Sequence, residues 1–83
     1  MIILEGSERD ACLLLREELH AKDLAGSLTQ EDLAVGYNFR LHILALHNLD
    51  PHDHVLDMQE AVIFTKDEQR SGAIQSYREM KRG

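Results

Sequence analysis

Apolar residues recur along most of the chain at spacings of three and four, the period of an α-helix that buries one face. With the flanking start and stop signals, this pattern predicts four helices, over residues 8–25, 30–49, 51–64 and 66–81. Three of these helices follow a hydroxyl residue with an acid three positions later, as in a capping box. The pairs are Ser7 with Asp10, Thr29 with Asp32, and Thr65 with Glu68. The remaining helix is predicted to start at Asp50 and Pro51, because Asp caps helix N-termini and Pro is accepted in the first turn.

The predicted helix over residues 30–49 is the most apolar of the four and carries two apolar stripes. At about 100° per residue, one stripe consists of Leu33, Tyr37, Leu41 and Leu44, and the other of Val35, Phe39, Ile43 and Leu46. Within the first stripe, Leu41 and Leu44 are expected to lie in the core and to meet the first and third helices. A helix with two stripes has to be covered on two sides, so we expect it at the centre of the fold.

These elements predict one all-α domain over residues 1–83, a compact bundle of three to four short helices around the second helix. A chain of this length has room for one core. Gly72 interrupts the last predicted helix and marks it as the least stable one. Two short apolar segments, residues 1–5 and 61–65, are also compatible with strands and could pair as a two-stranded ribbon. This alternative stays open, because short apolar runs fit either structure.

Charge and hydropathy narrow the classes of partner. Nine Lys and Arg against fifteen Asp and Glu give a net charge of −6 at pH 7, whereas proteins that bind nucleic acid need a basic face. The apolar runs are too short to span a bilayer, and residues 1–4 are too few for the apolar part of a signal peptide. We therefore expect a cytoplasmic protein without nucleic-acid or membrane partners.

The motifs of the common enzyme classes are missing from the sequence. It has no glycine-rich phosphate loop and no serine in a Gly-x-Ser-x-Gly turn. Its single cysteine, Cys12, lies in an apolar periodic segment, which is typical of a buried structural thiol. We therefore expect no enzyme and no cofactor, but a small acidic regulator, adaptor or inhibitor that binds another protein. The residues expected to bind that partner are the second stripe (Val35, Phe39, Ile43 and Leu46) and three acids, Asp53, Asp57 and Glu60.

The second stripe also predicts self-association. A domain this small has few elements with which to cover two stripes of one helix, and an exposed apolar row is unusual on a monomer. Pairing two copies about a twofold axis would bury the row twice, so we expect a homodimer. The alternative is that the fourth helix and the N-terminal segment cover the row within one chain.

A cluster of histidines supports an alternative function. Four of the five lie within thirteen residues, interleaved with aspartates, and both residue types are ligands of transition metals. His42 and His47 are five residues apart on a predicted helix and diverge by about 140°, so they cannot share an ion. A composite site would use His47 with His52 or His54 across the intervening turn. Residues 42–57 thus allow a metal or small-ligand site.

The step Gly26-Ser27-Leu28, in a short acidic helical chain, resembles the serine attachment site of acyl and peptidyl carrier proteins. The resemblance covers these three residues and implies a carrier-type domain with a prosthetic group on Ser27. In carrier proteins a helix begins directly at this serine, whereas here Thr29 is predicted to cap the next helix.

Overall fold

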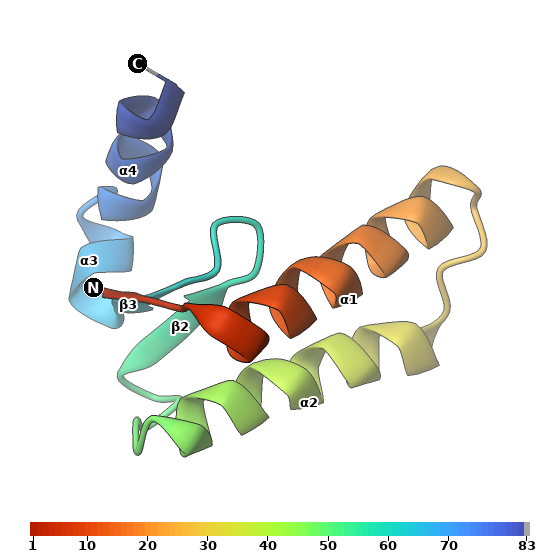
Figure 1. Ribbon diagram of the computed structural model, residues 1–83, viewed down its shortest axis with the longest axis horizontal. Helices are drawn as coiled ribbons and strands as arrows, with labels where there is room; N and C mark the ends of the chain where they lie inside the picture. Colours follow the sequence, from red (N-terminus) through yellow and green to blue (C-terminus); the bar gives the residue numbers. More distant parts are fainter. Residues whose placement is uncertain (83) are drawn as a thin grey trace.

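The computed structural model describes residues 1–82, which form four helices and a three-stranded sheet (Figure 1). In chain order the elements are β1 (Ile2–Ile3), α1 (Gly6–Leu24), α2 (Gln30–Leu46), β2 (His54–Asp57), β3 (Val62–Thr65), α3 (Lys66–Arg70) and α4 (Ala73–Arg82). The strands are antiparallel, and β3 lies between β1 and β2. The prediction of an all-α bundle is therefore wrong, although most of the chain is helical.

The largest correction concerns residues 51–64, which were predicted as a helix and form the β2–β3 hairpin instead. The apolar positions of this segment fit the period of a helix as well as that of a strand. Three of them carry β-branched side chains, which favour strands. Asp57 builds the turn, because its carboxylate accepts hydrogen bonds from the backbone N–H groups of Gln59 (2.9 Å) and Glu60 (3.3 Å). Such local side-chain bonds compete with a helix.

The predicted helix start at Asp50 and Pro51 is wrong for a related reason. The Asp50 carboxylate accepts a hydrogen bond from the backbone N–H of His52 over 2.9 Å. The Asp50 carbonyl oxygen accepts from the N–H groups of Asp53 and His54, both over 3.0 Å. These bonds close a turn that leads into β2, so the same Asp-Pro signal marks a turn rather than a helix.

The N-terminal segment and residues 61–65 do pair, but within a three-stranded sheet rather than as a two-stranded ribbon. Ile2 lies opposite Ile63 in the antiparallel register, and Ile3 lies opposite Val62. The backbone N–H of Leu4 donates to the carbonyl oxygen of the residue before β3 over 2.9 Å. Leu4 is only 1% exposed, so it anchors the N-terminus in the core.

The central strand β3 is buried on both faces, between the α1–α2 hairpin on one side and α4 on the other (Figure 1). Val62 and Phe64 pack with Tyr77 of α4, and the Phe64 and Tyr77 rings meet edge to face at a centroid distance of 6.0 Å. Ile63 points to the opposite face and shares a core with Cys12 of α1. Successive residues of one strand therefore hold two helical layers together.

Two of the three predicted capping boxes are confirmed. At the start of α2, the Thr29 hydroxyl accepts from the N–H of Asp32 (3.2 Å), and the Asp32 carboxylate accepts from the N–H of Thr29 (3.0 Å). Thr65 and Glu68 exchange the same two bonds at the start of α3, over 3.1 and 2.9 Å. The third box is wrong, because α1 begins at Gly6 and Ser7 lies within its first turn.

The last predicted helix, over residues 66–81, is divided into two. α3 ends at Arg70 and α4 begins at Ala73, with Gly72 between them at a φ of +79°. Glycine accepts this left-handed conformation without a steric penalty, so the break falls at Gly72. The predicted weak point is thus a junction between helices.

Helix α2 packs closely against α1 through Gly36. A Cβ atom at this position would lie 3.0 Å from Cδ1 of Leu19, so the glycine permits the approach of the two helices. The predicted core position of Leu44 is confirmed at 3% exposure, whereas Leu41 is only partly buried. None of the helices formed by residues 1–82 is long and apolar enough to cross a membrane.

Candidate functional site

The apolar stripe that was expected to bind a partner is divided between the core and the surface. Ile43 is 2% exposed and shares a core with Leu4 of the N-terminal segment, so its side chain is covered within the chain. Phe39 is partly buried against the same core. Val35 and Leu46, at the two ends of the stripe, each keep 54% of their surface exposed.

The exposed part of the stripe lies on the side of α2 that faces away from the sheet. Leu44 marks the side that faces the sheet, because it shares a core with Leu56 of β2. Val35 precedes Leu44 by nine residues and Leu46 follows it by two, which puts both about 160 to 180° around the helix from Leu44. We call Val35, Phe39 and Leu46 the outer stripe.

Two of the three acids expected to bind a partner are engaged in ion pairs within the chain. Asp57, whose side chain is 8% exposed, accepts a hydrogen bond from Nη2 of Arg78 over 2.5 Å. Oε2 of Glu60 lies 3.3 Å from Nζ of Lys81. Asp53 is exposed in the turn before β2. The pairs join the β2–β3 turn to α4, so they hold α4 against the sheet.

The histidines proposed as metal ligands are separated into two places. His47 lies at the end of α2, with its Nε2 atom 2.7 Å from the Glu8 carboxylate of α1. His52 and His54 line a cavity of about 300 Å³ together with lysine, arginine and aspartate side chains. Within residues 1–82, no group of three or more His, Cys, Asp or Glu side chains is arranged to hold a metal ion.

Ser27, the residue in the carrier-like step, lies in the loop between α1 and α2. Its hydroxyl and its backbone N–H both donate to the carbonyl oxygen of Lys22, over 3.3 and 2.9 Å. The next helix begins three residues later, after the Thr29 cap. Ser27 therefore satisfies a free carbonyl at the end of α1, and it does not stand at the start of a helix.

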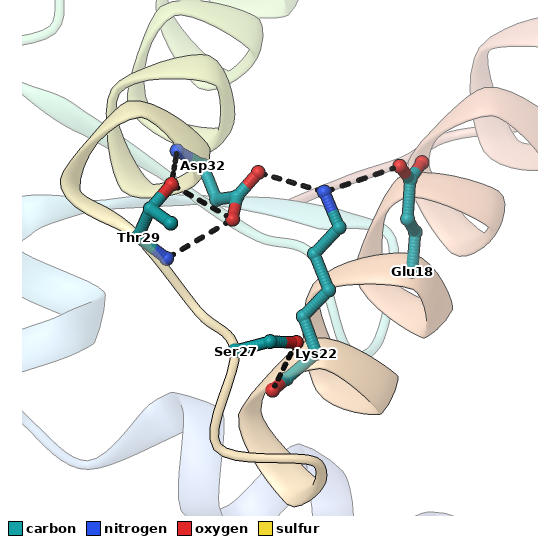
Figure 2. A network of polar contacts seen from close by, with 5 residues as sticks. All are labelled: Glu18, Lys22, Ser27, Thr29 and Asp32. Carbon is teal, nitrogen blue, oxygen red and sulfur yellow. Dashed lines mark hydrogen bonds and ion pairs between the residues drawn. The ribbon is translucent and has the colours of Figure 1, made fainter.

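Figure 2 shows how Lys22 joins α1 to the start of α2. Its Nζ atom lies 2.8 Å from Oδ1 of Asp32 and 3.7 Å from Oε1 of Glu18. The hydrogen bond from Lys22, followed by the bonds from Thr29, lowers the pKa of Asp32 to about 2. The same bond raises the pKa of Lys22. This network fixes the end of the helical hairpin at which the loop joins α1 to α2, away from the sheet.

The single thiol lies in the core. Cys12 is 0% exposed, and its Sγ atom lies 3.5 Å from the carbonyl oxygen of Met58. Burial raises the pKa of this thiol, and the charge of Asp57 acts in the same direction, while Arg40 and Arg16 act against it. A buried thiol with a raised pKa is a structural residue rather than a nucleophile.

A cleft with basic walls was missed by the sequence analysis. It has a volume of about 630 Å³ and lies between the α1–α2 hairpin, the edge strand β2, and the α3 and α4 helices. Its basic side chains are Arg16, His20, Arg40 and Arg78. The only sequence signal for this cleft was the presence of Arg16 and Arg40 among the apolar residues of α1 and α2. The cleft could not be placed from them, because β2 was predicted as a helix.

Two surfaces of the α1–α2 hairpin are therefore candidates for binding, the outer stripe on one side and the basic cleft on the other. Comparison with protein-family models, with curated proteins and with solved structures found no match to this chain.

Proposed function

We propose that this chain is a non-catalytic protein-binding module, a small acidic regulator, adaptor or inhibitor that forms a homodimer through the outer stripe of α2. The proposal is carried by the exposure of Val35 and Leu46. Both side chains keep 54% of their surface exposed, whereas Gly36, Ile43 and Leu44 of the same helix are buried. Partly buried Phe39 lies between them, so the stripe is an apolar row left over by a small fold.

A second copy of the chain is the occupant that fits this row best. Each chain has a net charge of −6, so two copies repel one another and have to meet on a surface without unpaired charge. The outer stripe itself consists of three uncharged apolar side chains. A twofold axis through the row would place apolar side chains against their own copies.

Dilution followed by NMR tests the proposal in the unaltered protein. Backbone amide spectra would be recorded from the highest to the lowest accessible protein concentration. We expect concentration-dependent shifts at Val35, Phe39 and Leu46, and constant positions at Thr65 and Gly72 on the far side of the sheet. Spectra that are identical at all concentrations, from a species with the mass of one chain, would overturn the homodimer.

A further inference from the structure

We propose that the cleft at the edge of β2 binds a small organic anion, one with a carboxylate or phosphate head group on an apolar body. The cleft lies on the opposite side of the α1–α2 hairpin from the outer stripe, so this inference is independent of self-association. Its volume of about 630 Å³ is in the range of small-ligand pockets, roughly 300 to 1,000 Å³.

Two of the basic side chains of the cleft, Arg16 and Arg40, are available to an anion. Arg78 is engaged by Asp57, the single carboxylate in the cleft wall. Arg16 and Arg40 have no ion pair or hydrogen-bonded side-chain partner within residues 1–82, in a chain whose acids outnumber its bases. A guanidinium group presents several N–H donors in one plane, which matches the oxygens of a carboxylate or phosphate.

The two arginines line the same cleft. They come from different helices, Arg16 from α1 and Arg40 from α2, and both line the same cavity. Both charges also act on the Cys12 thiol at the base of the hairpin, although burial and Asp57 outweigh them and raise its pKa. Two cations that line one cleft repel each other, and an anion bound between them would relieve this repulsion.

The remaining walls indicate an apolar body on the ligand. Leu19, Val55 and Ile74 contribute apolar surface from three different elements. A bare inorganic anion would leave these side chains in water, whereas an alkyl or aryl group would cover them.

An NMR titration with four probes separates the contributions of the head group and the body. The unaltered protein would be titrated, in its own oligomeric state, with four probes: hexyl phosphate, hexanoate, inorganic phosphate and hexanol. We expect hexyl phosphate or hexanoate to shift the amides of Arg16, Arg40 and Val55, with an affinity at least about tenfold higher than inorganic phosphate or hexanol. The tighter of the two amphiphiles identifies the head group. Equal shifts with hexanol would overturn the proposal, as would shifts that avoid the cleft.

Charge-neutralising variants provide the second arm. Arg16→Gln and Arg40→Gln should each weaken the binding of the better probe by about tenfold, because each removes charged hydrogen bonds to the head group. Arg70→Gln is the matched control, since Arg70 is exposed, pairs only with the neighbouring Asp67 and does not line this cleft. Because Arg40 is exposed, its replacement is expected to leave the fold intact even where Arg16→Gln disturbs it. Unchanged binding by Arg40→Gln would contradict the assignment.

Discussion

At the scale of single residues, the contacts of Asp32 have a consequence for the pH dependence of folding. Hydrogen bonds from Lys22 and Thr29 lower the pKa of Asp32 from 3.8 to about 2 in the folded chain. The ionised carboxylate therefore stabilises the fold above the unfolded pKa, and this contribution is lost as the pH falls from about 4 to about 2. An NMR titration of the carboxyl carbon should give a midpoint near the lower value, and Lys22→Met should raise it. A midpoint at the ordinary value in the unaltered protein would contradict the Lys22 contact.

The Thr29 hydroxyl provides a second test at this scale. Thr29→Ala removes the side-chain acceptor for the N–H of Asp32 at the start of α2. We expect the free energy of unfolding to fall by about 0.5 to 2 kcal/mol, as for other N-cap replacements. Urea denaturation measures the difference, and Thr29→Ser is the control, because it keeps the hydroxyl. Equal losses in both variants would point to the methyl group rather than to the cap.

At the scale of the elements, α2 holds the molecule together through its sheet-facing side. Leu44 is 3% exposed within the core shared by α1, α2 and the sheet, so Leu44→Ala leaves a cavity. We expect a loss of about 2 to 5 kcal/mol in the free energy of unfolding. Leu41→Ala, a matched change at a partly buried position, should cost clearly less. If the two variants were equally stable in urea, α2 would not face the sheet through Leu44.

Some of the helices and strands could be predicted from the sequence and others could not. Periodicity and capping boxes located α1, α2 and the start of α3, because these signals are local. The β2–β3 hairpin was missed for two physical reasons. A central strand buried on both faces gives a continuous apolar run that also fits a helix. The turn depends on the Asp57 carboxylate and on Ala61, which has a φ of +53°. An alanine does not indicate a positive φ in the way that a glycine would.

The candidate sites depended on these elements to different degrees. The outer stripe could be identified from the sequence, because its members lie on one helix at helical spacing. Burial of Ile43 could not, since it depends on the sheet that the sequence analysis lacked. The basic cleft depends on five elements at once, and Arg16 and Arg40 alone do not reveal the strand that completes it.

At the scale of the whole molecule, charge opposes the proposed association. Two chains of net charge −6 repel one another, and dissolved salt screens this repulsion over distances of about 10 Å at 0.1 M ionic strength. Association through an apolar stripe should therefore become stronger as the salt concentration rises. Sedimentation equilibrium at low and high sodium chloride measures the dissociation constant. A constant that increases with salt would indicate an interface built from ion pairs instead.

Light scattering coupled to size-exclusion chromatography tests the homodimer most directly, in the unaltered protein and three lysine variants. Val35→Lys and Leu46→Lys each place a charge in the outer stripe. Leu14→Lys is the matched control, because Leu14 is 67% exposed and lies two residues from buried Cys12, on the far side of α1. We predict twice the mass of one 9.5 kDa chain for the unaltered protein and for Leu14→Lys, and the mass of one folded chain for the two stripe variants. A single-chain mass for the unaltered protein at every concentration would contradict the account.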